Sequence, residues 1–306
     1  MSEPLREAGL SWAAAGEYGS IFGIRAVLFA ADVLGRRAAR LLLLPIVLYF
    51  FVVHFAVRRT SFDYLQRVLP TPPRAIDVYR YVLCFARVTL DRVFMLRRRD
   101  ELFDVAYSGH EILEDLWKRG QGAILLSAHL GSRSAMELGG HSERFRIHVA
   151  GRFRNTPRIN RILAEVSPRS VTRLVDLDPT NPKSILALRD LVRGGALVAM
   201  TADRTNQGDR CVTVPFLGGE ARFPLGPFLL ASLLDCPVVL VFALYEEPNR
   251  YELYCEPFSQ SLKAERRERG TAAMSEAAER FAARLERYCR AAPYNWFNFY
   301  DFWGAS

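Results

Sequence analysis

His129 stands where a buried strand of an α/β sheet is expected to end, and its side chain is well suited to acid–base chemistry. The apolar run AILLSA (residues 123–128) precedes it, and Leu130-Gly131-Ser132 follows as a turn into a helix. Ligands of α/β sheets bind beyond the carboxyl ends of strands. An imidazole titrates close to neutral pH, so it can move a proton there. A single histidine in such a place can equally be structural.

A second candidate cluster, Asp203-Arg204, follows another apolar stretch, ALVAMTA at residues 196–202. An Asp-Arg pair at a strand end can orient a carrier phosphate or polarise a carbonyl group. The same pair is also common on exposed surfaces, where it contributes little. The pattern alone leaves both interpretations open.

Two further segments are rich in aromatic residues. Residues 214–227 contain Arg222 between two turns rich in Gly and Pro, and a helix is expected to begin near Pro227. This segment fits the border of an apolar substrate channel, or a plain hairpin turn. PYNWFNFYDFW, residues 293–303, combines aromatic rings with polar groups, which is typical of a membrane–water interface or a lid.

The elements that must position these residues alternate between strands and helices from residue 100 onward. Continuous apolar runs predict strands, and apolar residues at three- and four-residue spacing predict helices. We expect an α/β fold with a mixed, mostly parallel sheet flanked by helices. The expected strands are residues 103–108, 123–129, 146–152, 171–177, 196–202, 236–245 and 251–258, and the expected helices are 110–120, 132 onward, 156–166, 183–195 and 271–289.

The N-terminal part is different, because it is apolar and basic. Residues 41–57, LLLLPIVLYFFVVHFAV, carry no charge and have arginines on both sides. Seventeen residues lie at the short edge of what crosses a bilayer, and Pro45 and His54 disfavour a simple span. A spanning helix, a monotopic or re-entrant anchor, and a buried core helix all remain open. We expect two domains: N-terminal membrane-anchoring helices at residues 1–60 and an α/β domain at residues 61–306.

Composition narrows the class of partner. Lys and Arg number 41 against 33 Asp and Glu, so the net charge of +8 favours an anionic partner such as phospholipid or an acidic carrier protein. The charge is spread out and no nucleic-acid-binding motif occurs, so we expect no nucleic-acid partner. The five cysteines form no CxxC pair and the five histidines are scattered, so no metal site is predicted.

The ordered series RRAARLLLLPIVLYFF, SAHLGS, TADR, VPFLGGEARFPLGPFLLASLL, NRYELYCEPF and PYNWFNFYDFW resembles the lipid A biosynthesis acyltransferase family, within the lysophospholipid acyltransferase superfamily. The likeness covers nearly the whole chain and is closest to the branch found with bacterial aryl-polyene and related lipid pathways. It implies transfer of a fatty acyl group from an acyl carrier protein or coenzyme A thioester to a lipid-like hydroxyl or amine. It also implies no cofactor, and a place on the cytoplasmic face of the bacterial inner membrane.

The family's H-x4-D/E motif implies that His129 is the general base. The motif places a carboxylate after four intervening residues, at position 134, to orient the histidine. Here Ser134 stands in the motif's acid position, and the nearest acid is Glu137. Three outcomes are open: Glu137 substitutes, His129 acts slowly alone, or the protein is a catalytically impaired homologue that binds lipid or scaffolds a pathway.

The resemblance also implies substrate-binding residues. Asp203 and Arg204 fall in the block that faces the acyl donor or the acceptor headgroup. Arg152 and Asn155 follow the second family strand, and Arg222 lies in the aromatic loop.

Overall fold

The structure is a computed structural model that describes residues 21–135, 145, 147–151, 174–177, 182–205, 208–270 and 272–304. The expected helix at residues 156–166 lies outside the described residues, as does the part after residue 135 of the helix expected from residue 132. Residues 133–135, after the turn that carries His129, form a short 3-10 turn.

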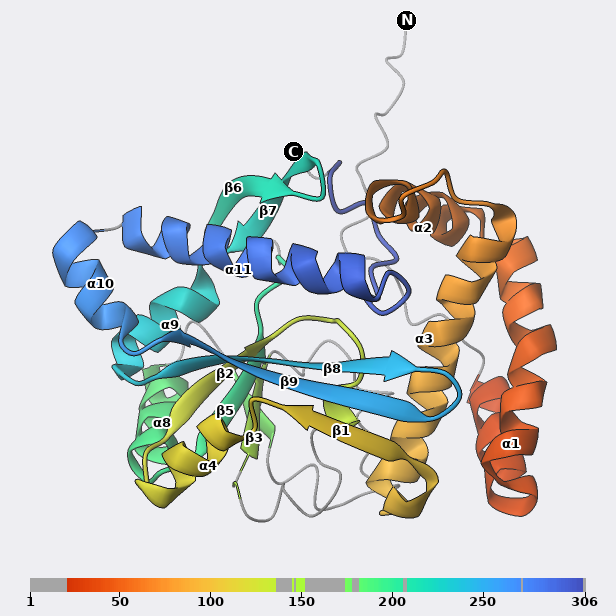
Figure 1. The fold of residues 1–306 in the computed structure, drawn as a ribbon, viewed down its shortest axis with the longest axis horizontal. Coiled ribbons are helices and arrows are strands. Elements are labelled where there is room, and N and C mark those ends of the chain that lie inside the picture. The colour runs from red at the N-terminus through yellow and green to blue at the C-terminus, as the bar shows by residue number, and fades with distance from the viewer. Residues whose placement is uncertain are drawn as a thin grey trace, which may run out of the picture.

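A seven-stranded sheet forms the centre of the molecule, in the order β1-β9-β8-β2-β5-β3-β4 (Figure 1). All neighbouring pairs are parallel except β8 and β9, which form an antiparallel hairpin. The prediction of a mixed, mostly parallel sheet is therefore confirmed. The strands are β1 (Asp104–Ser108), β2 (Ala123–Ser127), β3 (Ile147–Gly151), β4 (Leu174–Asp176), β5 (Leu197–Thr201), β8 (Val238–Glu246) and β9 (Arg250–Ser259).

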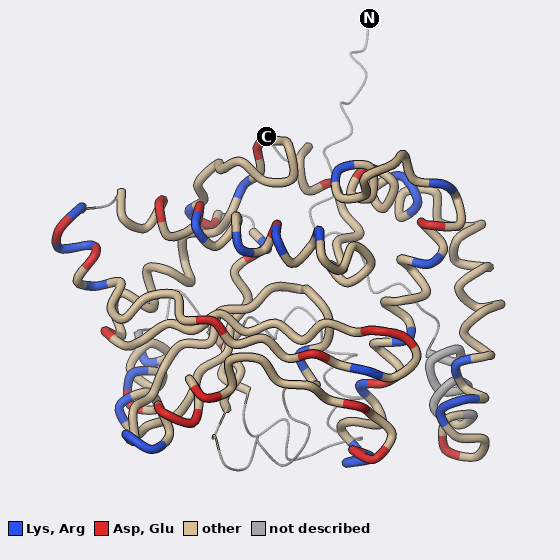
Figure 2. Tube along the Cα trace, viewed as in Figure 1, with Lys and Arg blue, Asp and Glu red and all other residues tan. Residues whose placement is uncertain are grey.

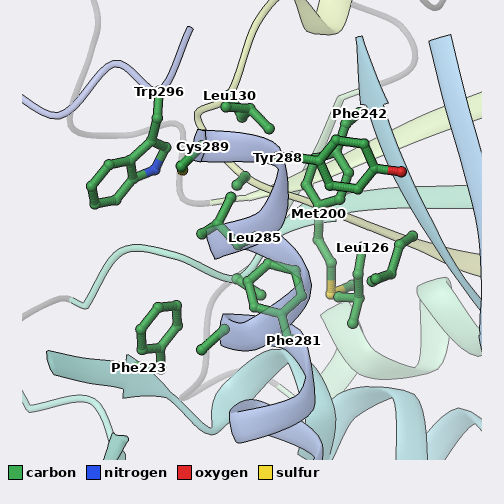
Figure 3. Close-up of a cluster of buried hydrophobic side chains, with 14 of the residues drawn as sticks. Leu126, Leu130, Met200, Phe223, Phe242, Phe281, Leu285, Tyr288, Cys289 and Trp296 are labelled. Atoms are coloured by element: carbon green, nitrogen blue, oxygen red, sulfur yellow. The ribbon is translucent and has the colours of Figure 1, made fainter. Parts of the chain in front are cut away.

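Alternation along the central strands explains the two apolar layers. Ile124 and Leu126 of β2 point to one face, and Ala123 and Leu125 point to the other, as the two-residue period of a strand requires. The first face packs on α8 (Pro182–Arg193), α9 (Gly226–Leu234) and α11 (Ala272–Ala291), and the second packs on α4 (Glu111–Lys118). Figure 3 shows the first layer, where Phe281, Leu285 and Cys289 of α11 lie among Leu126, Met200 and Phe242 of the sheet.

A separate antiparallel hairpin carries the aromatic loop. Strands β6 (Cys211–Phe216) and β7 (Gly219–Pro224) pair with each other, and β7 leads into α9 with a proline in its first turn. The hairpin interpretation of residues 214–227 is thus correct. The short helix α10 (Leu262–Arg269) connects β9 to α11.

Three helices precede the sheet and stand at its edge on one side of the molecule (Figure 1). They are α1 (Ile21–Val53), α2 (Phe55–Val68) and α3 (Ala75–Leu96), and a 3-10 helix (Asp100–Leu102) leads from α3 to β1. α1 kinks at Gly35, whose φ of 77° lies in the left-handed region, and it continues through Pro45. Ala39, Leu43 and Val47 pack against Leu83, Leu90 and Phe94 of α3.

A buried ion pair joins α1 to the α/β core. The Arg36 guanidinium donates two hydrogen bonds of 2.7 Å to the Asp91 carboxylate of α3. Asp91 is fully buried and also accepts a 2.9 Å hydrogen bond from the Tyr251 hydroxyl of β9. Arg40 reaches Glu247 and the Pro248 carbonyl at the β8–β9 turn. These contacts hold α1, α3 and the hairpin in one arrangement.

No single helix in the described part of the chain has the length and apolar character to cross a bilayer. One pair, Ala31–Val53 and Phe55–Val68, satisfies that test together, with a bend of 96° between its members at His54. The anchor role of the N-terminal helices therefore stays a prediction. The expected boundary between domains at residue 60 falls inside α2, and the two-domain division also stays a prediction.

Removal of Arg36 tests the buried ion pair. Arg36→Ala leaves the Asp91 carboxylate without its main partner in the interior, so the free energy of unfolding should fall by about 3 kcal/mol or more. The measurement is denaturant unfolding of the detergent-purified protein. Arg37→Ala, one residue away on the exposed side of α1, is the control and should change it by less than about 0.5 kcal/mol. Equal effects of the two substitutions would contradict a stabilising role for the pair.

Candidate active site

His129 and Asp203 meet because their strands are neighbours in parallel register. Ser127 at the end of β2 pairs with Thr201 at the end of β5, and each residue of interest lies two positions beyond. The Ala202 N–H donates to the Ser127 carbonyl oxygen at 2.9 Å, which extends the pairing past the strands. The tripeptides Ser127-Ala128-His129 and Thr201-Ala202-Asp203 thus end side by side at the carboxyl edge of the sheet.

The Asp203 carboxylate holds His129 at two points. Oδ1 lies 2.8 Å from the imidazole Nδ1, and Oδ2 accepts a 2.9 Å hydrogen bond from the His129 backbone N–H. Side-chain exposure is 1% for Asp203 and 35% for His129. An ionised carboxylate can only accept hydrogen bonds, so Nδ1 carries the proton. The Nε2 atom is then free to act as a base.

The turn after His129 depends on one glycine. Gly131 has a φ of 66°, and a Cβ atom there would collide with the Ala243 carbonyl oxygen of β8. The Ser132 N–H donates to that same oxygen at 2.8 Å. The chain can therefore leave β2 sharply beside β8, and the imidazole stays at the sheet edge.

Electrostatics match a neutral base beside an ionised acid. Burial lowers the pKa of His129, and the positive charge of Arg204 lowers it further, against the opposing effect of Asp203. Burial acts to raise the pKa of Asp203, but the charge and hydrogen bond of His129 and the charge of Arg204 outweigh it and lower the pKa to about 2. Near neutral pH the pair is therefore imidazole and carboxylate, ready to accept a proton at Nε2.

Arg204 contributes a cation next to this pair. Its guanidinium donates a 2.9 Å hydrogen bond to the Phe297 carbonyl oxygen and lies 6.0 Å from the centre of the Tyr300 ring. Half-buried arginine near a base can stabilise negative charge that develops on a substrate.

The other residues singled out in the sequence fall in different places. Ser134 is buried in the 3-10 turn, and Glu137, Arg152 and Asn155 lie outside the described residues. Arg222 is exposed on β7, opposite Thr213 of the separate hairpin. Among the described residues, no group of three or more His, Cys, Asp or Glu side chains is arranged to hold a metal ion.

The sequence pattern singles out Asp203, and its contact with substrate stays a prediction. In the structure, the buried Asp203 carboxylate lies against the His129 imidazole, a pairing that the sequence pattern does not predict. Trp296, whose indole Nε1–H donates to Asp203 Oδ2 at 3.0 Å, was not singled out at all. One signal in the sequence could have indicated the pairing of Asp203 with His129: Ser127-Ala128-His129 and Thr201-Ala202-Asp203 are similar tripeptides, and each ends an apolar strand.

Replacement of Arg204 tests the electrostatic account. Because the Arg204 charge lowers the pKa of His129, Arg204→Gln should raise the midpoint of the His129 titration. The measurement is an NMR titration of the His129 ring proton. Arg210→Gln removes the same charge from an exposed position and should leave the midpoint unchanged. A midpoint that Arg204→Gln does not move would refute this account.

Comparison with known proteins identifies a family for the chain. No curated protein matches the chain significantly. The family model described as bacterial lipid A biosynthesis acyltransferase matches residues 13–304. This match spans the helical N-terminal segment, both halves of the His129–Asp203 pair and the aromatic C-terminal segment. The chain therefore belongs to the bacterial lipid A biosynthesis acyltransferase family.

Proposed function

We propose that this protein transfers a fatty acyl group from a thioester donor to a hydroxyl or amine of a lipid-like acceptor, with His129 as the general base. The observation that carries the proposal is the pairing of a partly exposed imidazole with a buried, ionised carboxylate. Family membership supports acyltransferase activity, and it implies an acyl donor and a lipid-like acceptor in general. The aryl-polyene-like branch remains our preferred placement within the family.

The pair suits acyl transfer without a covalent enzyme intermediate. His129 Nε2 removes the proton from the acceptor hydroxyl or amine as that group attacks the thioester carbonyl carbon. The Asp203 carboxylate stabilises the imidazolium that forms. The tetrahedral intermediate then collapses, the new ester or amide bond remains, the C–S bond breaks, and the imidazolium returns its proton to the departing thiolate.

Arg204 is the described cation best placed to stabilise the oxyanion of that intermediate, since its charge already acts on the imidazole. The donor is an acyl carrier protein or coenzyme A thioester, and no cofactor or metal is needed for these steps. Arg152, Asn155 and Arg222 stay candidates for contacts with substrate.

A catalytically impaired homologue that binds lipid or scaffolds a pathway is the second candidate. Ser134 favours it, because serine cannot supply the negative charge of the motif acid. Asp203 weighs against it, because a carboxylate reaches the imidazole from a neighbouring strand instead. The orienting acid can lie on any element that brings its carboxylate to Nδ1 of the histidine, so we prefer acyl transfer as the function.

The proposed acceptor is reached from a membrane surface. Four residues of α1 are more than half exposed and recur at the spacing of one helix face: Leu41, Leu48, Tyr49 and Val52. Phe55, at the start of α2, is also more than half exposed. Figure 2 shows this stretch as an uncharged segment with basic residues at both ends. Large exposed apolar patches mark interaction sites, and flanking arginines suit anionic headgroups. We place the protein at the cytoplasmic face of the bacterial inner membrane.

Activity of histidine and aspartate variants tests the mechanism. Purified protein in detergent is supplied with acyl carrier protein or coenzyme A thioesters and lipid acceptors, and product is measured by mass spectrometry. His129→Ala should reduce transfer to the level of a blank. Asp203→Asn should lower kcat by about 10³–10⁴, because an amide cannot stabilise the imidazolium.

His110→Ala is the matched control, since His110 is exposed before α4, and it should retain parental turnover. Equal turnover by the parent and His129→Ala would contradict the mechanism. A parent that binds lipid but transfers no acyl group, and gains activity from Ser134→Glu, would favour the impaired homologue.

Vesicle binding tests the membrane surface. The double substitution Leu48→Glu with Val52→Glu places two charges on the exposed apolar face of α1. Co-sedimentation with phosphatidylglycerol vesicles should therefore fall by at least about tenfold, because two apolar side chains no longer enter the bilayer surface. Leu233→Glu in α9, also an exposed leucine, is the control and should bind as the parent does. Equal loss in both variants would exclude a specific role for the α1 face.

A further inference from the structure

The segment Asn295–Asn298 is buried in the described structure and lies against every member of the proposed catalytic group. Trp296 is only 1% exposed, and its ring contacts Tyr64 of α2, Phe216 of β6 and Phe302 at centroid distances of 4.9 to 5.3 Å. The sequence suggested an interfacial or lid role for this aromatic segment. The burial of Trp296 and Phe297 indicates an internal role instead.

Its first contact is with the acid. The Trp296 indole N–H donates to Asp203 Oδ2 at 3.0 Å, the same oxygen that accepts the His129 backbone N–H at 2.9 Å. Oδ1 is left for the imidazole. A buried carboxylate is costly unless donors satisfy it, and these N–H groups are what fixes its orientation.

The second contact is with the main chain of the base. The Phe297 N–H donates to the His129 carbonyl oxygen, and the Gly131 N–H donates to the Asn295 carbonyl oxygen, both at 2.8 Å. Leu130 and Trp296 thereby form an antiparallel bridge. The segment acts as a short added strand alongside the turn that carries His129, and the Phe297 carbonyl oxygen receives the hydrogen bond from Arg204.

The segment is itself held from both sides. The Asn295 side chain pairs with the Tyr245 main chain at the end of β8, with hydrogen bonds of 2.7 and 3.1 Å. The Tyr81 hydroxyl of α3 donates to the Trp296 carbonyl oxygen and accepts from the Asn298 N–H at 2.8 Å. Its position is therefore set by the sheet and by the N-terminal helices together.

We propose that Trp296 is a positioning residue of the acyl-transfer site: its indole N–H fixes the Asp203 carboxylate in the orientation that holds the His129 imidazole. This inference rests on the proposed function. Trp296 touches no reacting atom, and it acts through Asp203.

The proposal predicts a direction for the effect on His129. The indole N–H neutralises part of the charge on Oδ2, so without it the carboxylate attracts a protonated imidazole more strongly and the pKa of His129 rises. Among the described residues, the charged groups that act most strongly on the imidazole are Arg204, Asp203 and Arg133. The Cys289 thiol and Tyr300 phenol also feel the Asp203 charge, and burial raises the pKa of both, so both stay neutral as His129 titrates.

The kinetic test compares two tryptophan variants. Trp296→Phe keeps the ring and removes the N–H, so the acid limb of the kcat profile should move up by about half a pH unit. The plateau should fall by roughly tenfold, as when an orienting hydrogen bond is lost. Trp303→Phe is the matched control: its indole N–H donates to the Phe216 carbonyl oxygen in the same aromatic cluster, and its acid limb should not move. A folded Trp296→Phe variant with the parental acid limb would overturn the proposal.

A second measurement uses the unaltered chain. With 15N-tryptophan labelling, the Trp296 indole resonance should shift with pH at the midpoint of the His129 titration, and the Trp303 indole resonance should not. Single Phe substitutions at the other three tryptophans assign the spectrum, so this test holds even if Trp296→Phe fails to fold. A Trp296 resonance that stays constant through the His129 midpoint would overturn the proposal. Because no substrate is needed, the titration also separates failure of this inference from absence of acyl transfer.

Discussion

The hydrogen bond between His129 Nδ1 and Asp203 Oδ1 is the constraint on which the rest of the site depends. It requires β2 and β5 to be parallel neighbours in a register that ends both strands at one level. It also requires a buried negative charge, which the interior accepts only when hydrogen-bond donors surround it. The sheet order satisfies the first requirement, and the His129 backbone and Trp296 satisfy the second.

The second requirement explains why remote parts of the chain meet at the sheet edge. One donor to Asp203, the Trp296 indole N–H, comes from the C-terminal segment. That segment packs on α2 and α3 through Tyr64, Tyr81 and Phe85. The same helices pack against α1, and the Arg36–Asp91 ion pair joins α1 to α3. The proposed membrane surface and the proposed base are therefore parts of one packed unit. A change in how α1 sits on a bilayer would act on the helices that support the base.

The sequence predicts the mostly parallel sheet but not the pairing of His129 with Asp203. Strands such as β2, β5 and β8 are continuous apolar runs bounded by helices and turns, so periodicity found them, and alternation implied a mostly parallel sheet. It could not state which strands are neighbours, because strand order depends on long-range packing. Without the β2–β5 pairing, the sequence alone could not identify Asp203 as the partner of His129.

The burial of the aromatic segment at residues 293–303 could not be predicted for a related reason. Tyrosine and tryptophan suit an interface and an interior equally, and only their hydrogen-bond partners distinguish the two.

Ser134 acquires a different meaning from this arrangement. An acid on the helix after the base approaches the imidazole from the same chain segment, so its position follows the turn at Gly131. Asp203 approaches from the neighbouring strand instead, two residues beyond the end of β5, where the Ala202–Ser127 hydrogen bond continues the backbone pairing of the sheet. Under the proposed function, Asp203 takes the orienting role that the motif assigns to residue 134. What the site requires around Asp203 is the buried donor set formed by the His129 backbone N–H and the Trp296 indole N–H, which makes Trp296 as much a part of the site's architecture as the acid itself.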